Sequence, residues 1–233
     1  MKKIITILAF LCAALTTIYA ERVVLGAEQT KQYLPLLKGK RVALLSNHTG
    51  IVIQGKDTIH TLDLLLKHGV EVTATFSPEH GFRGTAREGE HVASSIDEKT
   101  GIPILSLYDG KSYRPSKEAM ATFDVLITDI QDVGLRFYTY YITMFRLMDA
   151  CAHEGKQFIV FDRPNPNGYY VDGPILDMKH KSGVGALPIP VVHGMTLGEL
   201  ALMINGGNWL YDSLKVDLSI IPCKNYTHQT LYR

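Results

Sequence analysis

The sequence has few cysteines and lacks the motifs of several large enzyme classes. It contains three Cys in 233 residues, and no Cys-x-x-Cys spacing suggests a zinc site. A Gly-x-Gly-x-x-Gly fingerprint and a Walker loop are both missing, so no nucleotide cofactor is indicated. The sequence also has no Gly-x-Ser-x-Gly elbow, which argues against an α/β-hydrolase.

An excess of charge of either sign is also missing. Lys and Arg number 24 against 23 Asp and Glu, and no basic stripe occurs, so the composition does not support binding to nucleic acid or to anionic lipid. A metal site is conceivable from His48, His80, His91, Asp129 and His193. Because the separations of these residues match no standard ligand motif, we predict no metal site. The hydrophobic content of 46% is that of an ordinary globular protein.

Residues 1–20 are predicted to be a secretory signal peptide. Lys2-Lys3 precedes an apolar run from Ile4 to Leu15, and Ala20 ends a plausible cleavage site. Acylation of Cys12 as a lipoprotein is disfavoured, because Leu11 stands where a small residue is needed. We therefore expect an exported protein, periplasmic or secreted, with no membrane span after the signal is removed.

Two cysteines, Cys151 and Cys223, remain after the predicted cleavage. In an oxidising compartment they can pair. Cys151 lies in a helical pattern, however, where a buried free thiol is equally compatible with the sequence. The sequence leaves both readings open.

Apolar runs alternate with helical patterns along the rest of the chain. Strands are predicted at 41–47, 70–76, 102–108, 123–132, 157–162, 187–193 and 214–221, and 50–55 is predicted to be a loop. Helices are predicted at 29–37 (broken by Pro35), 57–68, 117–122, 139–153 and 196–204, the last with a capping box of Thr196 and Glu199. Because the strands are apolar throughout, they predict a doubly wound α/β domain with a mostly parallel sheet.

Polar side chains follow five of the predicted strands where each ends. In open α/β sheets, ligands bind outside the carboxyl ends of the strands, so these segments predict a pocket. The segments are Ser46-Asn47-His48, Ser77-Pro78-Glu79-His80, Asp129 to Tyr138, Asp162 to Gly168, and His193-Gly194.

The second of these segments continues into the stretch richest in titratable groups. Arg83, Arg87, Glu90 and His91 follow Glu79 and His80 among several glycines, a density that an ordinary turn does not need. Glu79 has no evident structural duty and is the strongest functional candidate. Structural readings stay open for the others: a hydrogen bond to a loop for Asp129, an ion pair for Asp162-Arg163 and a core position for His193.

Long motifs in these segments resemble the NamZ-like exo-β-N-acetylmuramidases, glycoside hydrolase family 171, formerly a domain of unknown function. The motifs include Ser46 to Gly50, Pro78 to Gly84, Ser106 to Tyr108, Asp129 to Tyr140, Asp162 to Asn167 and His193 to Glu199. The resemblance implies release of non-reducing-terminal N-acetylmuramic acid from peptidoglycan fragments. It also implies a Rossmann-like domain at 21–205, with 206–233 as the beginning of a second, smaller domain that is truncated here.

The resemblance implies that Glu79 is the general acid, which protonates the leaving oxygen. Glu90 is the first candidate for a second carboxylate, followed by Asp129 and Asp132, unless the N-acetyl group of the substrate assists instead. Arg163, Arg136 or Arg83 is expected to bind the lactyl carboxylate of muramic acid. The full set predicted to bind substrate is Asn47, His80, Arg83, Gln131, Asp132, Arg136, Tyr138, Asp162, Arg163, Asn165 and His193.

Two other functions fit the same residues. An exported α/β domain with a polar rim is also compatible with a sugar-binding protein, although the number of acids favours an enzyme. A metal-dependent hydrolase is the third reading, and activity that survives chelators would exclude it.

Overall fold

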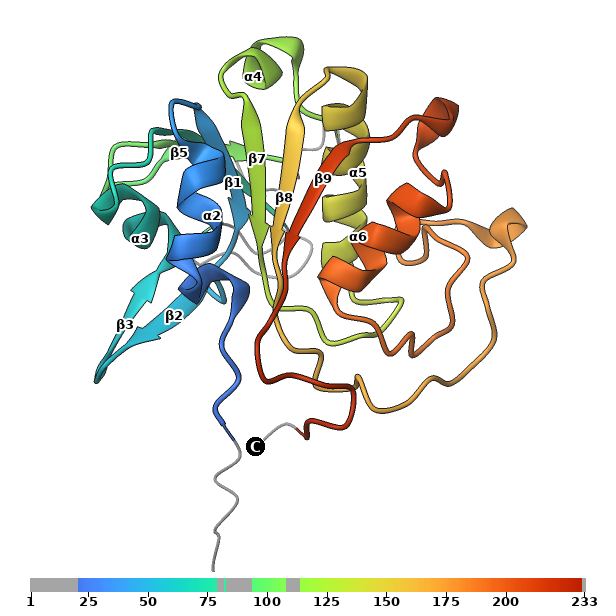
Figure 1. Cartoon of the computed structure of the whole chain (residues 1–233). Helices are drawn as coiled ribbons and strands as arrows, with labels where there is room; N and C mark the ends of the chain where they lie inside the picture. The colour runs from blue at the N-terminus through green and yellow to red at the C-terminus, as the bar shows by residue number, and fades with distance from the viewer. Residues whose placement is uncertain (1–20, 79–81, 83–93, 108–113, 232–233) are drawn as a thin grey trace, which may run out of the picture.

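The computed structural model describes residues 21–78, 82, 94–107 and 114–231, and these form an open sheet covered on both faces (Figure 1). The sheet order is β5-β6-β4-β1-β7-β8-β9. These strands are β1 (Val42–Ser46), β4 (Val72–Ser77), β5 (Ser95–Ile96), β6 (Pro103–Ser106), β7 (Val125–Asp129), β8 (Gln157–Phe161) and β9 (Asp217–Ile221). All neighbours pair in parallel except β5 with β6.

The parallel strands have the doubly wound order expected of a Rossmann-like domain. Counted along the chain, they stand in the sheet as third, second, first, fourth, fifth and sixth. The strand order reverses between β1 and β7, whose residues pair from Val42 with Val125 to Ser46 with Asp129. The predicted fold class is therefore confirmed.

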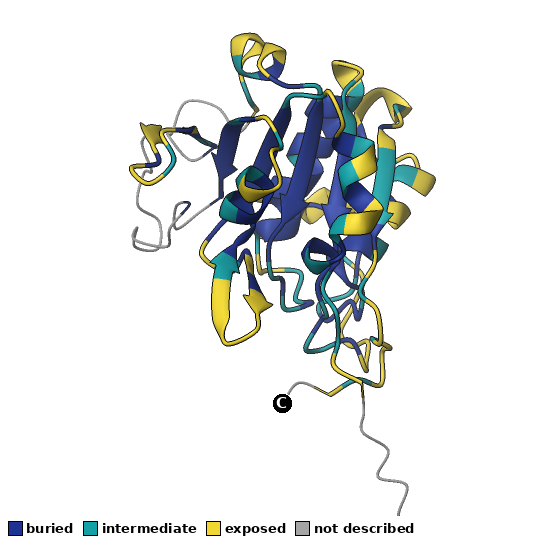
Figure 2. Ribbon diagram, turned by 60° about the vertical axis from the view of Figure 1, so that its left-hand side comes forward, coloured by how far each residue is buried: buried dark blue, intermediate teal, exposed yellow. Residues whose placement is uncertain are grey.

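Helices cover the two faces of the sheet, and each face has its own apolar core. One core contains residues of α2 (Thr30–Leu37) and α3 (Thr61–Lys67), together with η1 (Gly26–Glu28). The other contains residues of α4 (Lys117–Ala121), α5 (Tyr140–His153) and α6 (Leu197–Gly206). Two short 3₁₀ helices are η2 (Met178–His180) and η3 (Tyr211–Ser213). Figure 2 shows the central strands buried between these layers.

A hairpin replaces the loop and the first turn of helix predicted between Gly50 and His60. β2 (Ile51–Gln54) pairs antiparallel with β3 (Asp57–His60), and α3 begins only at Thr61. Gly55 adopts φ +65° and forms a two-residue turn with Lys56, a position where hairpins favour glycine. The hairpin projects from the domain with Ile51 and Ile53 exposed (Figure 2), so it lacks the pattern of a buried strand.

Two predictions for segments that contain proline are wrong. α2 continues through Pro35 without a break, because the carbonyl that would lose its partner belongs to the solvent-exposed Lys31. The strand predicted at 187–193 is not formed. Pro188 and Pro190 have no N–H to donate to a ladder, and this segment makes only isolated bridges, through Val192.

The last strand changes the expected domain boundary. β9 pairs with β8 along its whole length and so belongs to the first sheet, whereas residues 206–233 were expected to begin a second domain. Cys151 and Cys223 are both free thiols, which contradicts pairing. Within the described ranges, no helix is both long and apolar enough to cross a bilayer. The predicted signal peptide lies outside the described residues.

Candidate active site

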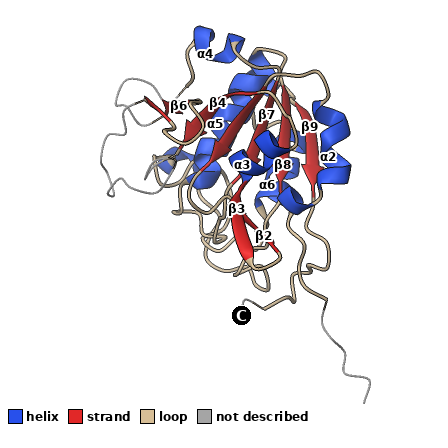
Figure 3. Cartoon of the chain, turned by 90° about the vertical axis from the view of Figure 1, so that its left-hand side faces the viewer, coloured by secondary structure: helices blue, strands red, loops and turns tan. Residues whose placement is uncertain are grey.

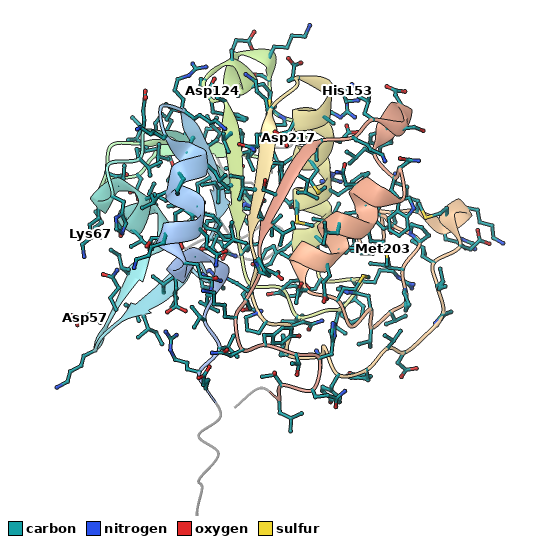
Figure 4. All side chains as sticks on the ribbon, viewed as in Figure 1. Asp57, Lys67, Asp124, His153, Met203 and Asp217 are labelled. Atoms are coloured by element: carbon teal, nitrogen blue, oxygen red, sulfur yellow. The ribbon has the colours of Figure 1, made fainter. Side chains whose placement is uncertain are left out.

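The described parts of the polar segments predicted from the sequence gather at the carboxyl edge of the sheet, below β1, β7 and β8 in Figure 1. Figure 4 labels Asp124 and Asp217 at the opposite edge, where β7 and β9 begin. In Figure 3 the loops likewise collect at the end of the domain near the C-terminus. The reversal between β1 and β7 lies at this edge, which is where doubly wound sheets bind ligands.

Asp129 and Arg163 form a buried ion pair at the centre of this edge. Arg163 Nε donates to Asp129 Oδ1 at 2.6 Å and Nη2 donates to Oδ2 at 3.1 Å. The hydroxyl of Thr61 also donates to Asp129 Oδ2, and Arg163 Nη2 donates to the carbonyl of Ile51. Asp129 is fully buried, so its contacts favour the structural reading that the sequence left open.

Asn47 is fully buried at the end of β1 and uses one side of its amide to shape the chain. Its Oδ1 accepts from the backbone N of Thr49 at 2.9 Å and from the Thr49 hydroxyl at 2.6 Å. Its Nδ2 has no hydrogen-bond partner among the described residues. His60 Nε2 donates to the Asn47 carbonyl, because His60 Nδ1 accepts from Leu62 N at the start of α3.

Asp132 and His193 are buried titratable residues that meet at Gly134. Asp132 Oδ1 accepts from Gly134 N at 2.7 Å, and His193 N donates to Gly134 O at 3.0 Å. Burial raises the pKa of Asp132 to about 7 and lowers the pKa of His193 to about 4. Asp132 Oδ2 and His193 Nε2 are buried, and neither contacts a polar partner in the described ranges.

Asp162 fixes the start of α6 instead of facing outward. Its Oδ2 accepts from the Thr196 hydroxyl at 2.7 Å, and its Oδ1 accepts from Gly198 N at 2.9 Å. Burial is the main cause that raises the pKa of Asp162 to about 6, against these hydrogen bonds. The predicted capping box is confirmed, with Thr196 and Glu199 bonded reciprocally. Both carboxylate oxygens of Asp162 are therefore used by the fold.

Asn165 and Gln131 also hold loops together. Asn165 Nδ2 donates to the Met195 carbonyl, and its Oδ1 accepts from Asn167 N. Gln131 Nε2 donates to the carbonyls of Asp132 and Pro164. These contacts join the loops after β7 and β8 to the segment before α6.

Arg136 and Tyr138 lie farther along the loop after β7. Arg136 Nη1 donates to the carbonyls of Pro174 and Ile189, while its Nε and Nη2 have no hydrogen bond within the part of the chain that is described. Tyr138 is partly exposed and its ring packs edge-on against Tyr140, with the ring centroids 4.9 Å apart. Arg136 is half-buried and keeps one edge of its guanidinium available.

Four predicted site residues, Glu79, His80, Arg83 and Glu90, lie outside the described residues. Phe82, from the same stretch, is described. It is buried, and its ring meets that of His60 edge-on with the centroids 4.9 Å apart. His60 is bonded to Asn47, so Phe82 is connected to the end of β1 through His60.

Three polar residues at this edge were missed by sequence reasoning: Thr49, His60 and Thr61. His60 and Thr61 were placed inside the helix predicted at 57–68. In the structure α3 begins at Thr61, and His60 is the residue that caps its start. The Asn47-His48-Thr49 spacing is the available signal for Thr49, since Asn commonly accepts from the backbone two residues on. We found no such signal for the bond between Thr61 and Asp129, which joins residues far apart in sequence.

Neither a metal-ligand cluster nor a hollow elsewhere on the described domain competes with this edge. The described residues contain no group of three or more His, Cys, Asp or Glu that is arranged to hold a metal ion. A hollow of about 700 Å³ lies between the carboxyl ends of α2 and α3. It is lined by Lys31, Leu34, Pro35, Leu37, Lys38, Gly39, Lys40, His68, Gly69, Val70 and Glu71. These residues lie toward the starts of β1 and β4, away from the polar edge.

The fold and its polar edge define a doubly wound α/β domain with a candidate site at the point where the strand order reverses. Residues 42–233 match the family described as exo-beta-N-acetylmuramidase NamZ, N-terminal. The chain belongs to this family.

Solved and curated relatives agree with this assignment. The chain is 45% identical over 196 residues to the peptidoglycan beta-N-acetylmuramidase NamZ of Bacillus subtilis (strain 168), covering 83% of this chain and 45% of the relative. Crystal structures of two DUF1343 family proteins from Bacteroides fragilis NCTC 9343 match 91% of this chain. The first is 62% identical with a TM-score of 0.80, and the second is 38% identical with a TM-score of 0.81. The chain covers 55% and 52% of these two proteins, so it spans about half the length of its relatives.

Proposed function

We propose that the protein is an exo-acting glycoside hydrolase that releases N-acetylmuramic acid from the non-reducing ends of peptidoglycan fragments. The observation that carries this proposal is the 45% identity with a relative named as a peptidoglycan beta-N-acetylmuramidase. The polar edge at the strand reversal supports it, because sugar hydrolysis needs several acids and hydrogen-bonding groups in one place.

Glu79 is the proposed general acid. It stands two residues after Ser77, which ends β4, and three residues before Phe82, which packs on His60. A carboxyl group in this role needs a raised pKa, and burial away from water is the usual cause of such a shift. Its proton passes to the glycosidic oxygen as the bond to the sugar breaks and an oxocarbenium-like transition state forms.

Glu90 is retained as the proposed second carboxylate. Asp129 is a weaker candidate, because Arg163 and Thr61 occupy its oxygens and it is fully buried. Asp132 keeps one oxygen without a described partner and remains an alternative. If the N-acetyl group of the substrate assists instead, this second acid orients that group.

Among the described residues, Arg136 is the proposed partner for the lactyl carboxylate of muramic acid. A bidentate contact needs two adjacent guanidinium nitrogens, and Arg136 keeps Nε and Nη2 uncommitted among the described residues. Arg163 is less suited, because its Nε and Nη2 bind Asp129. Arg83, the third candidate, lies outside the described residues.

We also propose that the protein acts outside the cytoplasm, in the periplasm or the medium. The support is the predicted signal peptide at residues 1–20, which places a short basic segment before an apolar run. Cell fractionation tests this, and recovery of the uncleaved protein in the cytoplasm alone would contradict it.

The catalytic proposal is tested with Glu79→Gln in the complete protein, using a chromogenic β-glycoside of N-acetylmuramic acid. Loss of a general acid lowers the rate on the order of 10²–10⁴-fold. Glu154→Gln is the matched control, because Glu154 is exposed at the far end of α5. Near wild-type release by Glu79→Gln would make the acid assignment wrong. Sugar binding without any release by the wild-type protein would favour a binding protein.

A further inference from the structure

Three buried residues at the carboxyl edge use the two polar atoms of their side chains in the same way. Asn47, Asp132 and His193 each use one side-chain atom to accept from the backbone N of the residue two positions later. The acceptors are Asn47 Oδ1 for Thr49, Asp132 Oδ1 for Gly134, and His193 Nδ1 for Met195. The second polar atom of each side chain is buried and has no partner among the described residues.

Asn165 shows that this turn does not by itself leave an atom unused. Its Oδ1 accepts from Asn167 N two positions later, as in the other three residues. Its Nδ2, however, donates to the Met195 carbonyl at 2.8 Å. A buried polar atom without a partner costs folding free energy, so the unused atoms of these three turns need an explanation.

The three residues belong to one continuous hydrogen-bonded chain. The Thr49 hydroxyl donates to Asn47 Oδ1 and accepts from Gln131 N, which links the end of β1 to the loop after β7. Asp132 follows Gln131, and its Oδ1 accepts from Gly134 N. Gly134 O then accepts from His193 N. These hydrogen bonds therefore connect the three turns to one another at the carboxyl edge.

We propose that Asn47, Asp132 and His193 form a subsite that binds uncharged hydroxyl and acetamido groups of a saccharide. Asn47 Nδ2 donates. His193 Nε2 also donates, because its Nδ1 accepts from Met195 and the ring is neutral. Asp132 Oδ2 accepts as a carboxylate or donates when protonated, and a sugar hydroxyl satisfies either state. This inference rests on the proposed function and deepens it by separating recognition of the sugar ring from recognition of the carboxylate.

The chemistry of the subsite favours a neutral ligand group. None of the three free atoms belongs to a cation at neutral pH, so a substrate carboxylate finds no charge partner here. Each buried donor or acceptor instead discriminates strongly against a ligand that leaves it unpaired. N-acetylglucosamine and N-acetylmuramic acid carry the same acetamido group and differ by the lactyl ether, so the subsite serves both sugars.

The test uses three substitutions that keep the turn and either change the free atom or, for His193, withdraw it by shortening the side chain. They are Asn47→Asp, Asp132→Asn and His193→Asn, where the new side-chain oxygen still accepts from the backbone two residues on. Asp177→Asn is the matched control, because the exposed Asp177 makes the same turn with Lys179. Binding of N-acetylglucosamine and of N-acetylmuramic acid to the complete protein is measured by NMR titration, and folding is checked by urea denaturation.

Asn47→Asp and His193→Asn are each expected to weaken binding of both sugars about 10- to 100-fold, leaving the ratio of the two affinities unchanged. Asp132→Asn is expected to keep binding within about threefold, because a sugar hydroxyl also satisfies the donor that the new amide presents. Unchanged affinity in folded Asn47→Asp and His193→Asn would overturn the proposal. Loss confined to N-acetylmuramic acid would also overturn it, since the subsite would then read the carboxylate. A wild-type protein that binds neither sugar refutes the subsite. One that binds both but releases neither from a glycoside refutes only the proposed glycosidase, and the affinity ratios still decide the subsite.

Discussion

Replacing Arg163 by Met is expected to destabilise the protein strongly, because it leaves the Asp129 carboxylate buried without a cation. The substitution removes two hydrogen bonds to Asp129 and one to Ile51 O, and among the described residues only the Thr61 hydroxyl remains as a donor to Asp129. Breaking a buried ion pair in this way costs about 3–5 kcal/mol. The whole free energy of unfolding of a domain is about 5–15 kcal/mol, so the change is a large fraction of it.

Urea denaturation measures this effect. With a slope of about 2 kcal/mol per molar urea, the loss lowers the midpoint by about 1.5–2.5 M. Adding Asp129→Leu to Arg163→Met is expected to recover more than half of the loss, because no unpaired charge then remains buried. A double variant that is less stable than Arg163→Met alone would refute this reasoning.

Arg41→Met is the matched control for Arg163→Met. Arg41 also contacts its partner Asp124 through Nε and Nη2, but both side chains are 42% exposed. Solvent screens this pair, so its loss is expected to cost about 1 kcal/mol or less. Equal effects of the two substitutions would show that burial does not decide the strength of the Asp129 pair.

Two further predictions concern Asp162, Gly198 and Asp132. Gly198→Ala is expected to lower stability by about 1–3 kcal/mol, because the added Cβ would lie 2.8 Å from the Asp162 carboxyl and from Ile220; an unchanged urea midpoint would contradict this close contact. Burial raises the pKa of Asp132 to about 7. The contribution of this shift to the free energy of unfolding is therefore fully present below the ordinary Asp pKa and is lost as pH rises through 7. Wild-type stability should therefore fall more between pH 5 and pH 8 than that of Asp132→Asn, and parallel urea midpoints at the two pH values would contradict the assignment.

The sheet was predictable from the sequence because its strands are apolar on both faces. Runs such as 41–47 and 123–132 read as buried strands and became β1 and β7. The hairpin was not predictable on the same grounds, since Ile51 and Ile53 face solvent and contribute nothing to a buried pattern. The strand predicted at 187–193 was wrong for a different reason. Prolines remove N–H donors from this apolar run without lowering its hydrophobicity, so the run still resembles a buried strand.

The location of the candidate site was predictable, whereas the duties of its residues were not. The ends of successive parallel strands meet at one edge, so the polar segments could be placed together. Whether a side chain is used by the fold depends on distant partners. Asp162 binds the start of α6, and Asp129 binds Thr61 and Arg163. Residue type alone does not distinguish these from Asp132, one of whose oxygens has no partner among the described residues.

The backbone of Asp162 joins both ends of the described chain. Its carbonyl accepts from Gly26 N, its N–H donates to Ile221 O, and Val24 and Lys224 exchange two hydrogen bonds beside it. Opening of either segment, 24–26 or 221–224, therefore removes partners from the other segment and from the residue that holds α6. Opening of these two segments and loss of order at the carboxyl edge should then occur as one cooperative unit, with matching rates of amide hydrogen exchange.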